Sequence, residues 1–410
     1  MTPTPTLTPT PTLTPTLAPP LNCPCRCLCS NNLSGCPVCA LRAHEQWQAF
    51  TARHPVATAS ELLEKAIRQD QAEVVLGALL NHHDGDGNGN GVPRDINEPC
   101  VSTRYGSVSP LMTALRAGSV RTLAMIAGHP GFDLLRSLTD FETWRWVRDA
   151  SPELLDQFLQ IPGSKVNQAD GNGKTMLHEA VDPSTAPETL RELLRQPGID
   201  VEAPQVDGTT ALYRAGLAGN RAAFEMLLAR GAAPDNRNRD NHWTVLMCAV
   251  AQGRDTIVDA LLHTPGIKLN VNAVDDFQNT ALHLAAQRGH TDMVEQLLSH
   301  PSVQVNLRNH LGWTALSLAA FAGHIDVVRR LLEIPELEVN AVDAQHQTAL
   351  FHAASAGQVD AVRLLVADPR VDADVRNRPS QHRAVDMAQA LGWHEIASIL
   401  SPVGDLAEDR

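Results

Sequence analysis

The sequence predicts an all-α solenoid, a row of short helix pairs that bury their apolar faces only against neighbouring copies of themselves. Residues 280–298, TALHLAAQRGHTDMVEQLL, show the unit: one amphipathic segment ends at Gly289, and a second carries Val294, Leu297 and Leu298 on its apolar face. Two segments of this length are too small to bury those faces alone, so the chain has to supply neighbours of the same kind.

The same frame recurs at a nearly constant spacing. Its other copies begin at Thr175 (TMLHEAV), Thr210 (TALYRAG), Thr244 (TVLMCAV), Thr314 (TALSLAA) and Thr348 (TALFHAA). Successive opening threonines lie 34 to 36 residues apart. In this register the six copies resemble the ankyrin repeat, with its T-P-L-H-x-A signature and period of about 33 residues. The extra length falls in an arm after the second segment, such as HPSVQVN from His300.

The resemblance implies about nine or ten repeats, and we expect the rest of the chain to be organised around them. The expected parts are a disordered Pro/Thr-rich tail at 1–20, a cysteine-rich segment at 21–55, the solenoid at 59–400 with an inserted Gly/Asn/Asp-rich loop at 82–99, and a C-terminal tail at 401–410. The prolines of the first tail favour an extended polyproline II conformation.

Six of the eight cysteines lie within 17 positions, between Cys23 and Cys39. The Cys36-x-x-Cys39 pair is half of a tetrahedral zinc site, and Cys25 and Cys29 could supply the other half. Acylated or redox-active thiols are a second interpretation, and the absence of any specific role is a third. We assign no metal or other cofactor to the chain on this pattern.

The first repeat is expected from Ala59, with Leu62, Leu63, Ala66 and Ile67 facing inward. In the loop that follows, the side chains of Asp84, Asp86, Asn88 and Asp95 match part of a calcium-binding EF-hand loop. Because the loop has Gly91 in place of an apolar residue and Asp in place of the final Glu, we interpret it as an insertion between repeats.

Two further copies flank the regular series. One opens at Ser109, and a degenerate one follows from Thr143, where Trp144 and Trp146 replace small residues. We expect these rings to pack a local irregularity, with a ligand pocket as the alternative. The last copy, from His382, is expected to close the C-terminal end of the solenoid.

No arrangement of residues predicts catalysis. His178 and His283 occupy the histidine of T-x-L-H, which in the ankyrin family forms hydrogen bonds within and between repeats. Residues 171–175, GNGKT, have the composition of a phosphate loop but neither its glycine spacing nor a preceding buried strand. We therefore expect a non-enzymatic protein.

Binding is what the resemblance implies, through a concave groove of first helices and a row of hairpin fingertips. The expected partner-binding residues are Trp243, Phe277, His310 and Trp313 at the fingertips, and Leu284, Arg288 and Phe321 in the groove. Arg254 is expected outside this surface. The alternative for each tryptophan is that its ring lies flat on the next finger.

The net charge of −13 argues against nucleic acid, because phosphate binding needs a basic face. No apolar run approaches the roughly 20 residues of a membrane span. Without a secretory signal in the sequence, we expect a cytoplasmic, monomeric scaffold for a partner protein. The alternatives are a substrate-recruiting subunit of an enzyme or ubiquitin-ligase complex with a zinc-binding N-terminus, or a secreted bacterial effector, which the presence of only four lysines would suit.

Overall fold

The structure is a computed structural model. It describes residues 45–50, 52–53, 59–72, 74–75, 78, 97, 101–103, 106–129, 132–134, 138, 144–378 and 380–401. The tail at 1–20, the cysteines up to Cys39, the EF-hand-like residues Asp84 to Asp95 and the end after Ser401 lie outside the described residues. The chain divides into two compact units, 1–146 with 150–165 and 147–149 with 166–410.

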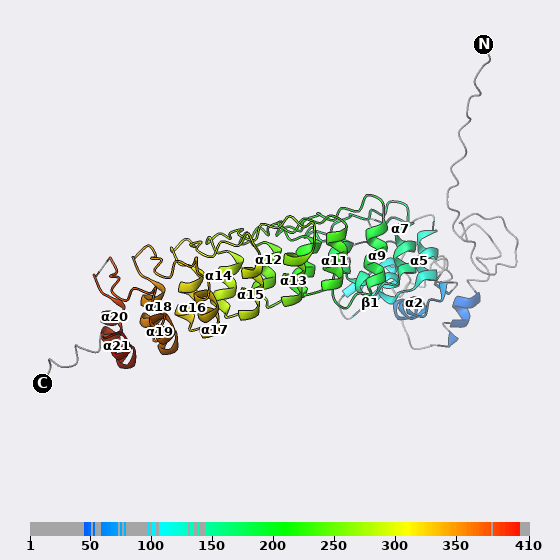
Figure 1. The fold of residues 1–410 in the computed structure, drawn as a ribbon. Helices are drawn as coiled ribbons and strands as arrows, with labels where there is room; N and C mark the ends of the chain where they lie inside the picture. Colours follow the sequence, from blue (N-terminus) through cyan, green and yellow to red (C-terminus); the bar gives the residue numbers. More distant parts are fainter. Residues whose placement is uncertain are drawn as a thin grey trace, which may run out of the picture. The chain divides into compact units, whose positions relative to one another are not determined.

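The first unit combines helices with one small hairpin (Figure 1). Its elements are α2 (Ala59–Arg68), β1 (Val101–Thr103), β2 (Gly106–Val108), α4 (Pro110–Ala117), α5 (Val120–Ala127) and α7 (Pro152–Leu159). In α2 the side chains of Leu62, Leu63, Ala66 and Ile67 are buried, as expected. The strands are antiparallel, with Val101 opposite Val108. These strands were not expected, because helical periodicity in the sequence gives no indication of strands of three residues.

The degenerate copy has a 3-10 helix, η2 (Arg145–Asp149), in place of a first helix. Trp144 and Trp146 are buried, and their rings lie 6.0 and 5.1 Å from the ring of Phe158. This confirms that bulky rings pack a local irregularity. Trp47 and Phe50 are also buried, although both fall in the segment expected to be separate from the solenoid.

The second unit is a regular series of helix pairs. The pairs are α8 (Met176–Ala180) with α9 (Pro187–Arg195), α10 (Ala211–Ala218) with α11 (Arg221–Ala229), α12 (Val245–Ala251) with α13 (Asp255–His263), α14 (Ala281–Arg288) with α15 (Thr291–Ser299), α16 (Ala315–Ala322) with α17 (Ile325–Leu332), α18 (Ala349–Ser355) with α19 (Val359–Val366), and α20 (Ala384–Ala390) with α21 (His394–Leu400).

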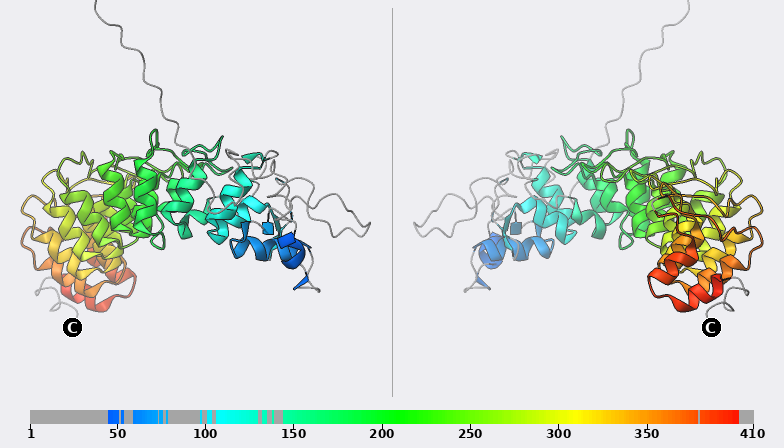
Figure 2. Two further views of the ribbon diagram at one scale, coloured as in Figure 1. Left: turned by 90° about the vertical axis from the view of Figure 1, so that its right-hand side faces the viewer. Right: turned by 90° about the vertical axis from the view of Figure 1, so that its left-hand side faces the viewer.

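From α10 onward each first helix contacts the next first helix, and from α9 each second helix contacts the next second helix. The pairs follow one another in chain order from green to red in Figure 2. This arrangement confirms the all-α solenoid. Among the described residues, no helix combines the length and apolar character needed to cross a membrane.

The sequence frame explains each pair. In the copy from Thr280, the threonine caps α14, because its hydroxyl accepts a hydrogen bond from the backbone N–H of His283. Gly289 ends the helix in the left-handed conformation, with φ of 73°. On α15 Leu297 is fully buried, whereas Leu298, expected on the apolar face, is only half-buried. Of the two leucines, Leu297 therefore makes the larger contribution to the core.

Asparagines tie the arms of neighbouring repeats together. The side-chain amide of Asn306 donates to the carbonyl of Glu336 (2.8 Å), and its oxygen accepts from the backbone N–H of Glu338 (2.9 Å). Asn272 and Asn340 make the same pair of bonds to the next arm. These asparagines lie 34 residues apart and satisfy backbone groups that no helix serves.

Candidate interaction surface

Four of the fingers are tight turns held by a polar side chain five residues before the opening threonine. The Oδ1 atom of Asp275 accepts from the backbone N–H groups of Phe277 (2.9 Å) and Asn279 (2.7 Å). The Oδ1 atom of Asn309 does the same for Leu311 and Trp313, both at 3.0 Å. The turn is thereby fixed through its own backbone, and the tip side chains are free to vary.

Neighbouring fingers are joined at their tips by backbone hydrogen bonds. The N–H of His310 donates to the carbonyl of Phe277 (2.9 Å), and the N–H of Ala344 donates to that of Leu311 (3.2 Å). Because these bonds link equivalent positions, Phe277 and Leu311 lie on adjacent fingers of one continuous row.

The two fingertip tryptophans contact the next finger or repeat. Trp243 is half-buried and donates from Nε1 to Oδ2 of Asp275 (3.2 Å). The ring of Trp313, also half-buried, lies 4.0 Å from the ring of His352. Both side chains therefore contact the next repeat, Trp243 through a hydrogen bond and Trp313 through a ring tilted by 36° to that of His352 on α18.

Other aromatic and aliphatic side chains, at the fingertips and at the end of α16, are exposed to solvent. Phe277 is 56% exposed, and Leu311 and Phe321 are each 46% exposed. The ring of Phe277 lies 5.3 Å from that of His310, which is also exposed. The ring of Phe321 lies 5.3 Å from that of Trp313, so a fingertip and the end of a first helix meet in one aromatic pair.

The structure separates two of the expected groove residues. Leu284 is only 4% exposed, so its expected place on a partner-facing surface is wrong: its side chain packs inside the helix stack. The equivalent Cys248 and Leu318 are buried too. Arg288, in contrast, is exposed, and its Nη1 donates to the carbonyl of Ala251 in the preceding repeat (2.8 Å).

The histidines of T-x-L-H are structural, as expected. In the copy from Thr280 the Nδ1 atom of His283 lies 2.8 Å from the threonine hydroxyl, and Nε2 lies 3.1 Å from the carbonyl of Trp313. His178 has the same contacts with Thr175 and Thr209. Burial lowers the pKa of both side chains, to about 4 for His178, so each is neutral near pH 7.

A buried pair lies beneath Trp313. The Nε2 atom of His352 is 3.1 Å from Oδ2 of Asp343, and both side chains are buried. Burial lowers the pKa of His352, although the carboxylate of Asp343 opposes that shift. Sequence reasoning missed this pair, because His352 lies one position beyond the histidine of the repeat signature.

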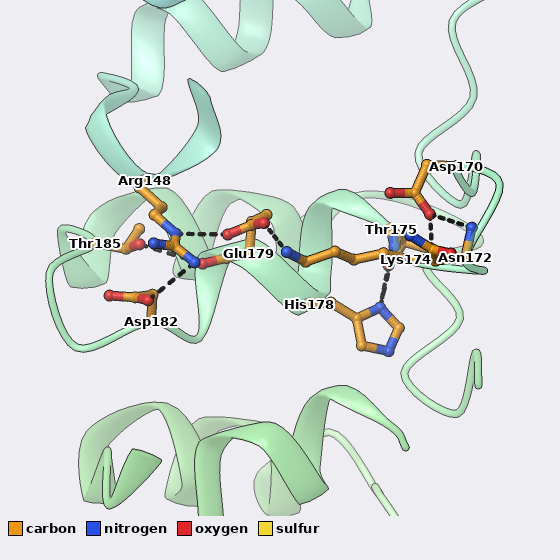
Figure 3. A network of polar contacts seen from close by, with 9 residues as sticks. All are labelled: Arg148, Asp170, Asn172, Lys174, Thr175, His178, Glu179, Asp182 and Thr185. Carbon is orange, nitrogen blue, oxygen red and sulfur yellow. Dashed lines mark hydrogen bonds and ion pairs between the residues drawn. The ribbon is translucent and has the colours of Figure 1, made fainter. Parts of the chain in front are cut away.

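A polar network holds the first regular repeat of the second unit (Figure 3). The buried carboxylate of Glu179 accepts from Nε of Arg148 (2.6 Å) and from Nζ of Lys174. Arg148 also pairs with Asp182 at 3.3 Å. Burial alone would raise the pKa of Glu179, but the hydrogen bonds from Lys174 and Arg148 outweigh it, and the pKa is lowered.

Residues 171–175 form a finger turn, which supports the rejection of a phosphate loop. The Oδ1 atom of Asp170 accepts from the N–H groups of Asn172 and Lys174, both at 2.9 Å. A carboxylate at the mouth of the turn and a lysine already paired with Glu179 leave no favourable place for a phosphate. In the part of the chain that the structure describes, no three His, Cys, Asp or Glu side chains gather as metal ligands.

The stacked helix pairs and linked fingers define a helical repeat protein. A family model described as ankyrin repeats in three copies matches residues 146–238, 177–275, 227–309, 246–343 and 282–379, together more than half of the chain. The chain belongs to the ankyrin repeat family.

Three curated proteins illustrate the similarity. The E3 ubiquitin-protein ligase KEG of Arabidopsis thaliana is 30% identical over 179 residues, 42% of this chain and 10% of that protein. Neurogenic locus notch homolog protein 1 of Xenopus tropicalis is 29% identical over 37% of this chain and 6% of its own length. YahD of Escherichia coli K12, named for its ankyrin repeats, is 29% identical over 28% of this chain and 56% of its own length. The chain thus spans less than two thirds of each relative.

Proposed function

We propose that the chain is a non-enzymatic scaffold that holds a partner protein on the surface between Trp243 and Phe321. Ankyrin repeats are in general modules for protein–protein interaction. Cytoplasmic location, a monomeric state and the absence of a nucleic-acid partner remain predictions, as does the division of the chain at residues 20, 55, 59 and 400.

The observation that carries this proposal is a set of exposed apolar side chains on consecutive repeats. Phe277, Leu311 and Phe321 are exposed although they neither cap a helix nor fill the core. Exposed apolar side chains that gather on neighbouring elements are typical of an interface. The ring of Trp313 packs edge-on against that of Phe321, which reduces the side-chain entropy that would be lost on binding.

The test uses the full chain as bait to purify a partner, followed by affinity measurements with single variants. Phe277→Ala and Phe321→Ala should each weaken binding by at least about tenfold, because anchors near the centre of an interface contribute most of its affinity. Trp313→Ala should weaken it as well, but that variant also removes a brace and must first be shown to stay folded.

The matched control is Val366→Ala. Val366 is an exposed apolar side chain on α19, a second helix away from the tips, and its loss should leave affinity unchanged. Equal affinity of wild type, Phe277→Ala and Phe321→Ala would move the interaction elsewhere, with the cysteine-rich segment and the loop at Asp84 as the next candidates.

A further inference from the structure

A row of side chains follows the ends of the first helices, and each lies against a carbonyl of the preceding repeat. The contacts are Arg254 Nε to Leu217 O (3.1 Å), Arg288 Nη1 to Ala251 O (2.8 Å), His324 Nε2 to Gln287 O (3.0 Å) and Gln358 Nε2 to Phe321 O (3.1 Å). We call Arg254, Arg288, His324 and Gln358 the capping row. Arg254, expected outside the groove, reaches the end of α10 with its guanidinium.

The capping function does not require a positive charge. Gln358 fulfils it with a neutral amide, and Asn220 does so for the carbonyl of Val181 (3.0 Å). A helix C-terminus favours a cation by only about 0.3–1 kcal/mol at an exposed site. The charges of Arg254 and Arg288 therefore exceed what the fold needs.

Both guanidinium groups keep donors for a further acceptor. A guanidinium has five N–H donors, and each of these arginines uses a single nitrogen for its carbonyl. Within the described residues, the other nitrogens of Arg254 and Arg288 make no hydrogen bond or ion pair, and both side chains are exposed. A carboxylate can accept two such N–H groups at once.

The row is free of acids and is flanked by apolar side chains. The helix ends 217–220, 251–254, 287–290, 321–324 and 355–358 contain no Asp or Glu, in a chain of net charge −13. Leu217, 43% exposed, lies at the end of α10 and Phe321 at the end of α16. The nearest acids along the chain lie in the first turns of the second helices, where the helix N-terminus stabilises them. They are Asp255, directly after Arg254, with Asp292, Asp326 and Asp360.

We infer that the capping row binds an acidic segment of the partner protein, with carboxylates opposite Arg254 and Arg288 and apolar residues on Leu217 and Phe321. This inference rests on the proposed function and names the chemistry of the partner. Packed helices are about 10 Å apart, so three steps from α10 to α16 span about 30 Å, the length of about nine extended residues.

The experiment selects random displayed peptides of about nine residues on the full chain and measures the affinity of the most enriched peptide. We expect enrichment of Asp and Glu in the centre and of Leu or aromatic residues at the ends. The double variant Arg254→Gln with Arg288→Gln keeps an amide for each carbonyl but removes both charges. It should bind that peptide at least about tenfold more weakly, since close charge pairs in interfaces contribute that much.

Arg329→Gln is the matched control. Arg329 is exposed on the second helix α17 and its side chain makes no hydrogen bond or ion pair in the described part of the chain, so its loss should not change affinity. Peptides without acidic residues, or acidic peptides held equally well by the double variant, would overturn the inference.

Two outcomes separate this inference from the proposed function. Selected peptides that are neutral or basic, yet depend on Phe321, would support the surface and reject the acidic partner. Recovery of no peptide would reject the acidic segment, while purification of a partner through Phe277 and Phe321 would still test the function. If sedimentation shows a dimer that dissociates in Phe321→Ala, the occupant is a second copy, which also overturns the inference.

Discussion

The finger before Thr175 and the finger before Thr314 have the same kind of backbone turn but differ in their side chains. Both turns are held by a side-chain oxygen five residues before the threonine, from Asp170 in one and Asn309 in the other. In the first finger, Lys174 pairs with the buried Glu179. In the second, the equivalent position is Trp313, which contacts the exposed Phe321.

The comparison shows that the frame and the surface of a repeat are independent. Turn, cap and core are fixed by residues that recur in most copies, because they satisfy backbone groups and fill the stack. The remaining positions hold an ion network in one copy and an apolar patch in the other, while the turn and the cap are kept. This independence allows the same fold to present a polar surface at one finger and an apolar one at another.

The largest expected effect concerns what the two repeats share. Leu193 and Leu331 are fully buried at matching places on α9 and α17. Leu193→Ala and Leu331→Ala should each lower the free energy of unfolding by about 2–5 kcal/mol, because each leaves a cavity. Urea denaturation measures this, with the half-buried Leu298→Ala as a milder control. A large loss for one leucine and none for the other would show that the repeats do not share a core.

The next effect distinguishes the fingers. Glu179→Ala removes the carboxylate between Arg148 and Lys174 and should lower the free energy of unfolding by about 3 kcal/mol, because it leaves the partly buried Lys174 without its partner and Arg148 with only Asp182. Glu188→Ala is the control, since Glu188 forms only an exposed pair with Arg191. If both variants unfold at the same urea concentration, the network contributes nothing to stability.

The smallest expected effect is on the pH dependence of the free energy of unfolding. Burial lowers the pKa of His178 to about 4, below its value near 6.5 in the unfolded chain, so the unfolded state binds the extra proton first. The contribution of neutral His178 is complete above about pH 6.5 and is lost as the pH falls toward 4. In the copy from Thr314 the same place holds Ser317, which does not titrate in this range.

His178→Ser should therefore make the repeat from Thr175 resemble the one from Thr314. Between about pH 7 and about pH 4.5, wild type should lose roughly 2 kcal/mol more of its unfolding free energy than His178→Ser does. Parallel pH profiles for the two proteins would mean that His178 is not buried in the neutral form. His283 titrates in both proteins, so its contribution cancels.

The exposure of most of the expected surface residues could be predicted from their position in the repeat, and the wrong predictions have physical causes. Phe277, His310 and Phe321 are exposed as expected, because a tip or helix end has few neighbours. The prediction that Leu284 faces a partner was wrong, because repeat geometry gives the direction of a side chain and not whether the adjacent helix buries it. The asparagines of the arms are marked in the sequence by a Val-Asn pair every 34 residues. That pattern alone does not show that they form hydrogen bonds with the next arm.

The sequence by itself determined the class of fold, the register of the repeats and the structural histidines, since these depend on local caps, turns and apolar periodicity repeated many times. Only the tertiary structure decided that Trp243 and Trp313 brace the next repeat, that His352 lies on Asp343, and that Arg254 reaches the end of α10. The contacts of Trp243, Trp313 and Arg254 join residues 30 or more apart, and the pair of His352 with Asp343, nine positions apart, depends on the depth at which Trp313 and the stack cover it. Such facts arise from the packing of one repeat on another, which no single copy of the motif contains.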